Sequence, residues 1–351
     1  MTTWFRARDL SGLELAERGL IPERLIRMGI RRLLRQRLRT LPAGHGSAAE
    51  ATDRFIASLR DNPIALLPES ANQQHHEVPA AFYELVLGPC LKYSCCTFDT
   101  MTERLAEAEV CALAQVVERA QIEDGMSVLE LGCGWGSFSA YLAQHLPNCR
   151  VTAVSNSHSQ GEFVRRRLAA AGVAEPDVVT ADMNTFEAGK HYDRIVSIEM
   201  FERMRNWGLL FERMSRWVKP EGRIFLHFFC NNEHAYAFED QGSAGWMARN
   251  FFGGGMMPSF DLPRRFDDRL EVDAFWKVDG VHYERTSELW LANLYGARKA
   301  VLALFEEVYG QGQGERWFQR WRLFFLACAE LFGHNRGDTW FVAHYRLRPK
   351  V

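Results

Sequence analysis

Two glutamates that could act on a reacting atom lie three positions apart, after an apolar run. On a helical turn Glu199 and Glu202 would share one face, and Arg203 follows them directly. Paired carboxylates can stabilise positive charge that develops during a reaction, and one of them can accept a proton. The alternative is a solvated pair neutralised by Arg194 or Arg205.

A glycine-rich loop stands earlier in the chain, where residues 130–136 read ELGCGWG. Glycines there allow a ligand to approach the backbone closely, and the amides of the next helix add positive potential. The G-x-G-x-G spacing differs from that of dinucleotide sites, and Ser155, Asn156 and Ser157 stand where such sites need an acid. Together with Asp182, the loop resembles the cofactor site of Rossmann-like methyltransferases. The alternative is a purely structural turn.

The elements that would position these residues alternate between apolar runs and helical periodicity. The pattern predicts an α/β fold with a mostly parallel, doubly wound sheet that helices cover on both faces. Ligands bind such sheets where the strands end, which is where the glycine loop and the glutamates stand. Strands are expected at 127–131, 150–154, 177–180, 193–198 and 222–229, and helices at 104–120, 137–145, 158–171 and 206–218.

The sequence predicts two regions, an N-terminal extension and a larger domain. Residues 1–70 are expected to form a basic helical N-terminal extension, and residues 71–351 a methyltransferase domain. Within that domain we expect an aromatic cap, a Rossmann-like core, two mostly helical lid insertions and two late strands of the same sheet. Their predicted ranges are 71–103 for the cap, 104–230 for the core, about 231–263 and 286–332 for the lid, and about 269–281 and 339–347 for the strands.

Composition and charge limit the kinds of partner that the protein is expected to bind. The net charge of -2 over 351 residues gives no reason to expect nucleic acid binding. The first 40 residues hold ten arginines and four acids, which suits a solvated helix face, a homodimer contact or, less well, peripheral membrane contact. The eight cysteines lack metal-ligand spacing, so no metal site is expected, and their usage indicates a reducing, cytoplasmic location. No stretch approaches the ~20 apolar residues of a membrane span.

Eight less generic stretches point to one group of proteins. They resemble the cyclopropane-fatty-acid synthase superfamily, and within it the coclaurine N-methyltransferase branch of plant alkaloid enzymes. The stretches are HHEVPAAFYELVLG (75–88), LKYSCCTFD (91–99), ELGCGWGSFS (130–139), SNSHSQGEF (155–163), YDRIVSIEMFE (192–202), GGMMPS (254–259), HYERTSELW (282–290) and RWRLFFLACAELF (320–332).

The resemblance implies S-adenosyl-L-methionine as the cofactor and assigns its contacts. The methionine end would lie against Tyr93, Ser94 and the glycine loop, the ribose near the second strand, and the adenine near the third. The implied cofactor residues are Tyr93, Ser94, Glu130, Gly132, Gly134, Trp135, Gly136, Asn156, Gln160, Asp182 and Met183.

The same resemblance implies residues near the reacting atoms. Fatty-acid cyclopropane synthases bind bicarbonate through a set of residues whose counterparts here are Cys95, Glu202, His227 and Tyr283. The synthases usually carry glycine at the position of Glu199, whereas the alkaloid branch carries a second glutamate. His227 could equally be a core histidine with satisfied hydrogen bonds. Ahead of the cap, Glu77 is a further candidate to face the site.

Methyl transfer to the nitrogen of a small, cyclic or aromatic amine is therefore the expected activity. An attacking amine gains positive charge, which a carboxylate stabilises more in the transition state than in the ground state. Aromatic side chains of the cap and lid could wall its pocket. The alternatives are lipid modification or cyclopropanation of unsaturated acyl chains, and cofactor binding without catalysis.

Arg203 departs from the group, which has histidine there. Arginine stays protonated and cannot accept the proton of an ammonium ion. Either Glu199 or Glu202 takes that proton, or the amine arrives neutral. The guanidinium is also expected to lower the pKa of both glutamates. If Arg203 does neither, it is a surface or lid-packing residue.

Overall fold

The computed structural model describes residues 11–41, 47–66, 78–101, 103–238, 245–266 and 268–350. Its core is a seven-stranded sheet in the order β3-β2-β1-β4-β5-β9-β8. The first five strands along the chain pair in parallel, and β9 runs antiparallel to both of its neighbours. The strands are β1 (Ser127–Leu131), β2 (Arg150–Ser155), β3 (Asp177–Thr180), β4 (Tyr192–Ile198), β5 (Val218–Asn231), β8 (Leu270–Val278) and β9 (Trp340–Pro349). The predicted mostly parallel, doubly wound sheet is confirmed.

Alternate residues of the central strands pack against helices on opposite faces. Val128 and Phe225 point into a cluster with α6 (Leu105–Ala120) and α7 (Ser137–His145). Leu129 and Leu226 point the other way, into a cluster with α9 (Trp207–Trp217). Both faces are covered, which is why apolar residues such as Val128 and Leu129 follow each other in a strand instead of alternating with polar ones.

Local signals set where several helices begin. The Ser157 side chain accepts from the amide of Gln160 at the start of α8 (His158–Ala170), and Asn206 accepts from Leu209 at the start of α9. Such N-caps satisfy amides that have no partner within the helix. Both caps stand just after the carboxyl edge of the sheet, so each helix leaves the edge that carries the site.

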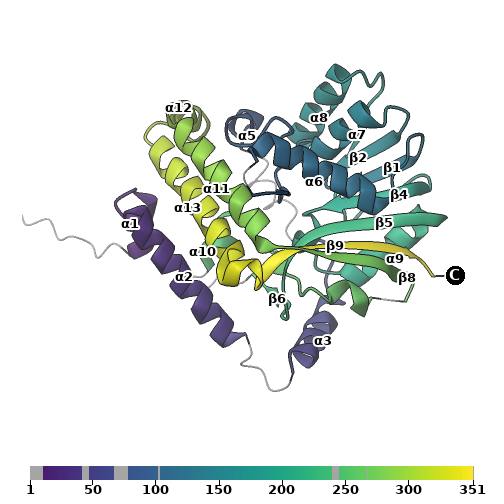
Figure 1. Cartoon of the computed structure of the whole chain (residues 1–351), viewed down its shortest axis with the longest axis horizontal. Coiled ribbons are helices and arrows are strands. Elements are labelled where there is room, and N and C mark those ends of the chain that lie inside the picture. Colours follow the sequence, from purple (N-terminus) through teal and green to yellow (C-terminus); the bar gives the residue numbers. More distant parts are fainter. Residues whose placement is uncertain are drawn as a thin grey trace, which may run out of the picture.

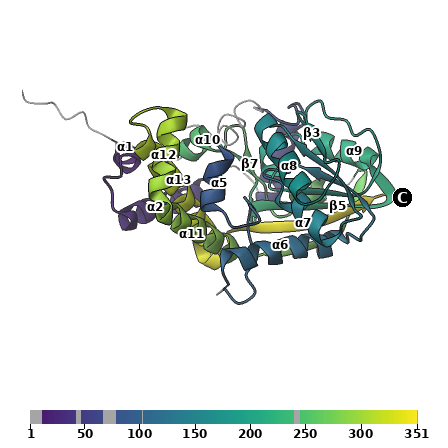
Figure 2. The same ribbon diagram turned by 90° about the horizontal axis from the view of Figure 1, so that it is seen from above.

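A helical lid lies beside the end of the sheet where β9 begins. It consists of α11 (Gly280–Gly296), α12 (Arg298–Tyr309) and α13 (Gly314–Phe332), and α5 (Ala80–Val86) lies between it and the sheet (Figure 1). The N-terminal helices α1 (Gly12–Glu17) and α2 (Glu23–Thr40) lie along the outer side of α13 (Figure 2). A third helix, α3 (Ala48–Leu59), sits below the sheet in Figure 1.

Salt bridges fasten the basic N-terminal helix to this lid. Arg27 pairs with Glu288 at 2.6 Å and with Glu330 at 3.1 Å, and Arg31 also pairs with Glu330. Glu17 of α1 is buried and accepts hydrogen bonds from Trp246 and from two arginines of α13. Part of the predicted basic surface is therefore an internal contact.

The prediction of a mostly helical first lid insertion is wrong for the described part of residues 231–263. That part holds one five-residue helix, α10 (Trp246–Asn250), a two-stranded sheet of β6 (Tyr236–Ala237) and β7 (Met256–Met257), and the start of a short 3-10 turn, Leu262–Arg265. Three consecutive glycines at 253–255 disfavour a helix. Aromatic side chains of this segment, Trp246, Phe251 and Phe252, pack against the core.

Candidate active site

The glycine loop forms one wall of a cavity at the carboxyl edge of β1, β2 and β4. Gly132, Gly134 and Gly136 all have positive φ, at 80°, 51° and 73°, a conformation in which glycine has no steric cost. A Cβ on Gly134 would meet no atom of the described residues within 4 Å apart from its chain neighbours, and this glycine lines the cavity. The backbone here is thus bare toward the space in which a ligand would lie.

Gly136 has a different role from the one the resemblance implies. It is the N-cap residue of α7, and a Cβ there would stand 3.0 Å from the side chain of Val164. It is not among the residues that line the cavity in the described part of the chain. We therefore assign it to helix packing.

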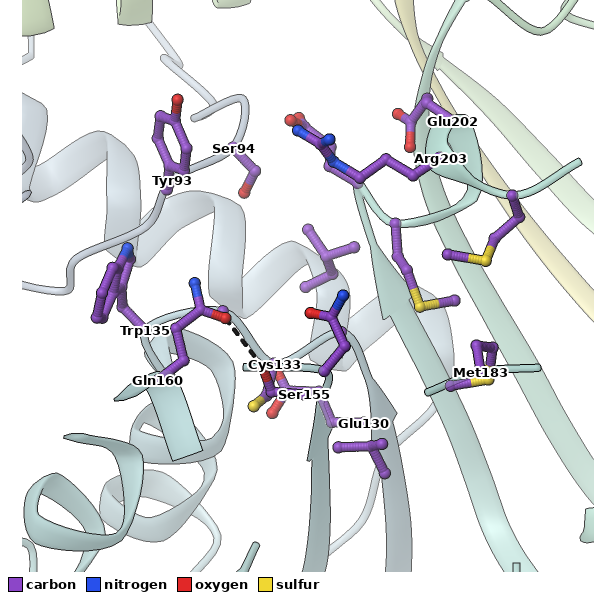
Figure 3. A pocket seen from close by; sticks show the side chains of 18 of the residues that line it. Tyr93, Ser94, Glu130, Cys133, Trp135, Ser155, Gln160, Met183, Glu202 and Arg203 are labelled. Carbon is purple, nitrogen blue, oxygen red and sulfur yellow. Dashed lines mark hydrogen bonds between the residues drawn. The ribbon is translucent and has the colours of Figure 1, made fainter. Parts of the chain in front are cut away.

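Ten of the eleven predicted cofactor residues line this one cavity, which makes it a candidate S-adenosyl-L-methionine site. Figure 3 places Tyr93, Ser94 and Trp135 on one side and Glu202 with Arg203 on the other. Gln160 accepts from Ser155 at 3.0 Å at the lower edge (Figure 3). The ten are Tyr93, Ser94, Glu130, Gly132, Gly134, Trp135, Asn156, Gln160, Asp182 and Met183.

Two buried polar groups line this wall, the carboxyl group of Glu130 and the indole nitrogen of Trp135. Burial raises the pKa of Glu130 to about 7, although Ser139 donates a hydrogen bond to it. The indole Nε1 of Trp135 is buried and finds no hydrogen-bond partner in the described part of the protein. The bare glycine backbone and this uncommitted donor both fit a polar cofactor in the cavity.

Glu199 also lines this cavity, and its carboxylate has three hydrogen-bonding neighbours. Its Oε1 accepts from the backbone amide of Cys95 at 2.9 Å and lies 3.2 Å from Nε2 of His227. Its Oε2 accepts from the hydroxyl of Tyr283 at 2.6 Å. Cys95 contributes its backbone, while its own thiol is buried with a pKa raised by burial.

Three of the four residues that the resemblance assigned to bicarbonate thus hold the carboxylate of Glu199. The fourth, Glu202, accepts from the amide of Phe229 at 2.6 Å through Oε1. Its other oxygen, Oε2, is buried and has no hydrogen-bond partner in the described part of the protein. Glu202 lines the cavity and is 1% exposed, so this oxygen is shielded from bulk water.

The expectation that Glu199 and Glu202 share a helical face is wrong. Glu199 has a positive φ of 49° and lies outside the short 3-10 helix Phe201–Arg203. Both side chains nevertheless line the same cavity. A left-handed residue followed by a tight turn brings them to it, and such strain at a non-glycine residue is common at functional sites.

The expectation that Arg203 keeps the two glutamates more firmly ionised is wrong, although its charge does lower the pKa of both. Burial raises the pKa of Glu199 and raises that of Glu202 well above its ordinary value, and the charge of Glu199 raises the latter further. The charge of Arg203 opposes these shifts but is a smaller influence than desolvation. The guanidinium donates to the carbonyl of Phe251 at 3.3 Å and lies 5.1 Å from the ring centroid of Phe252.

The sequence missed several residues that support the site. Buried Lys92 donates to Ser94 at 2.6 Å and to the carbonyl of Cys95, which holds the cap loop beside Glu199. His344 of β9 hydrogen-bonds to His227 at 2.8 Å. Lys92 stood in a family stretch and could have been singled out as a charge inside an apolar segment, whereas His344 gave no signal in its strand.

Only some of the aromatic residues predicted for the cap and lid line the cavity. Of the aromatic residues of cap and lid, Tyr83 and Phe252 line the cavity, while Trp290, Trp321 and Phe325 pack within the core beneath it. Glu77 lies outside the described residues. No described helix has both the length and the apolar character needed to cross a membrane.

Comparisons with known proteins match this chain to one family. Residues 67–342 match the family described as mycolic acid cyclopropane synthetase. An (S)-coclaurine N-methyltransferase from Thalictrum flavum subsp. glaucum is 35% identical over 96% of this chain and 95% of that enzyme. A cyclopropane-fatty-acyl-phospholipid synthase from Escherichia coli (strain K12) is 25% identical over 78% of this chain and 67% of the synthase.

A solved structure gives the same picture. The crystal structure of a coclaurine N-methyltransferase bound to N-methylheliamine and SAH superposes with a TM-score of 0.91 at 35% identity, covering 96% of this chain and 98% of that one.

Proposed function

Since this chain belongs to the mycolic acid cyclopropane synthetase family, we propose that it methylates the nitrogen of a small, cyclic or aromatic amine. It is a methyltransferase that uses S-adenosyl-L-methionine. The similar N-methyltransferases and the structure bound to N-methylheliamine support an amine substrate. The observation that carries the proposal is the pair of buried carboxylates, of which Glu202 has one oxygen without a hydrogen-bond partner among the described residues.

The cofactor, when bound, supplies an electrophilic methyl group on a sulfonium, and the protein positions the nucleophile. The amine must present its lone pair in line with that methyl group. Aromatic rings of Tyr83, Phe229 and Phe252 line the cavity and attract a cationic amine through their faces. The buried carboxylate of Glu202 would then stabilise the charge that grows on nitrogen.

Glu202 is also suited to receive the proton that the amine loses. Its raised pKa favours the protonated form when no amine is bound. The positive charge that grows on nitrogen favours its ionised form, and the ammonium product of a secondary amine can then transfer its proton to Oε2. Arg203 cannot perform this step because it stays protonated, so we assign it to packing against Phe252 and to the charge balance of the cavity.

Glu199 supports the amine reading over cyclopropanation. Its carboxylate takes the donors of Cys95, His227 and Tyr283. A free bicarbonate would have to share these donors with a fixed anion, which costs Coulomb repulsion in a buried place. We infer that the tethered carboxylate takes over the place of the free anion.

A mass-spectrometric screen tests the proposal. The protein and S-adenosyl-L-methionine are offered cyclic secondary and tertiary amines beside unsaturated phospholipids, and products heavier by one methylene group are sought. We expect methylated amines that form only when the cofactor is present. Modified phospholipids as the sole products would overturn the proposal in favour of the lipid reading.

We further propose a cytoplasmic location and a homodimer. Cysteine usage without metal or disulfide spacing supports the first. The exposed apolar side chains of Leu25 and Met28 on α2, and of Leu20 just before that helix, support the second.

A further inference from the structure

Hydrogen bonds link four side chains into a chain that runs from Arg119 in the last turn of α6 to the carboxylate of Glu199. Nη1 of Arg119 lies 2.6 Å from Nδ1 of His344, whose Nε2 lies 2.8 Å from Nδ1 of His227. Nε2 of His227 then lies 3.2 Å from Oε1 of Glu199. We propose that Arg119 and His344 are positioning residues, which orient Glu199 by fixing the protonated nitrogen of His227.

The direction of the chain follows from its first member. Arginine only donates hydrogen bonds, so Nδ1 of His344 must accept and its proton must sit on Nε2. That proton points at Nδ1 of His227, which must accept in turn. The proton of His227 therefore lies on Nε2, directed at the carboxylate of Glu199. One donor-only cation sets both tautomers.

Burial keeps both histidines neutral, which the argument requires. His227 and His344 are 3% and 2% exposed, and burial lowers the pKa of each well below its ordinary value. The charges that face the pair, Arg119 and Lys92, lower both values further. A neutral imidazole carries one proton, so each ring has one donor and one acceptor.

The sheet holds the chain rigidly. His227 of β5 and His344 of β9 are direct cross-strand partners, with ring centroids 4.6 Å apart. Arg119 stands in the last turn of α6 with its guanidinium 5.1 Å from the ring centroid of Trp276. Two strands and a helix thus fix the spacing that the hydrogen bonds need.

Loss of His344 would free His227 to take the other tautomer. Nε2 would then present a lone pair to the carboxylate, and Glu199 would lose one of its three donors. The amide of Cys95 and the hydroxyl of Tyr283 would remain. Such a carboxylate would be less firmly oriented and its ionised form less stabilised.

Nitrogen NMR on the unaltered protein tests the tautomers without any variant. In protein labelled with ¹⁵N-histidine, the rings of His227 and His344 should each show a protonated Nε2 and an unprotonated Nδ1 at pH 7. Assignment uses the loss of one signal set in each single histidine variant. A proton on Nδ1 of either ring, or a cationic ring, would overturn the proposal.

Kinetic measurements test whether loss of His344 weakens catalysis through Glu199. This part of the test rests on the proposed amine methylation. Glutamine at 344 can accept from Arg119 through its carbonyl and donate to His227 through its amide, whereas leucine can do neither. We expect His344→Leu to lower kcat about 10- to 100-fold, as removal of an outer hydrogen-bond partner often does. His344→Gln should recover most of that loss, with cofactor Kd unchanged in both.

The controls separate failure of this inference from failure of the proposed function. His334→Leu removes a partly buried histidine that hydrogen-bonds to Thr339 and has no described hydrogen bond to Arg119, His344, His227 or Glu199. This variant should leave kcat unchanged. If His344→Leu and His344→Gln lose kcat equally while folded, the positioning role is refuted. If the parent methylates no amine at all, the proposed function fails, and the NMR arm alone decides the tautomers.

Discussion

Replacing Glu202 with glutamine separates its charge from its shape. The amide of Phe229 can still donate to the glutamine carbonyl, as it does to Oε1 at 2.6 Å. The new NH₂ group would take the place of Oε2, which has no partner to lose in the described part of the protein. We therefore expect the fold to survive and the negative charge beside the amine to disappear.

The expected loss is mainly in kcat. Removing one preorganised electrostatic contact at a reacting atom costs about 10²–10³ in rate, or ~2.7–4 kcal/mol. Steady-state assays with an identified amine should show that loss, while calorimetry shows cofactor affinity within a factor of about 2. Glu162→Gln, which removes an exposed carboxylate of α8, is the matched control for net charge. Parental turnover by Glu202→Gln would refute the catalytic role.

The same variant has a signature in stability. The unfolded chain ionises this carboxyl near its ordinary pKa, whereas the folded protein holds the proton to higher pH because burial raises the pKa of Glu202. The unfolded state therefore gains relative stability as pH rises between those two values. Without ligands, Glu202→Gln should have a higher Tm than the parent at pH 8 and a similar Tm at pH 4. A Tm difference that is the same at both pH values would contradict the burial argument.

Three further predictions concern the cofactor loop, the amine and the lid. Gly134→Val should abolish cofactor binding in a folded protein, since the residue has φ 51° and faces the cavity; near-normal affinity by calorimetry would remove the loop from the site. Turnover should rise with pH in step with the pKa of the free amine, and Arg203→His should raise activity more at pH 7 than at pH 9; a profile that is flat through the amine pKa would count against this. Burial raises the pKa of Glu17, but the hydrogen bond from Trp246 and the charge of Arg320 outweigh it and lower that pKa overall. In thermal melts, Glu17→Gln should therefore lower Tm at pH 7 and lose this effect as pH falls below about 4.

The local signals of the α/β core were sufficient to predict it. Strands such as β1 and β4 are buried on both faces, so apolar residues stand next to each other in them, as at Val128-Leu129 and Ile195-Val196. Glycine at 132 and 134 meets a backbone need that other residues meet poorly. Family stretches added the cofactor residues, because direct contact with a shared ligand restricts residue type.

Tertiary structure decided what the carboxylates touch. Glu199 meets Cys95, His227 and Tyr283, which are 104, 28 and 84 positions away, so no local pattern could predict these bonds. Its left-handed backbone replaced the expected helical turn. The pKa directions also came from folding, because desolvation depends on how completely the surrounding chain excludes water, and here it outweighs the adjacent arginine. Residue types and their order could be read from the sequence; the direction of each hydrogen bond required the packed sheet and lid.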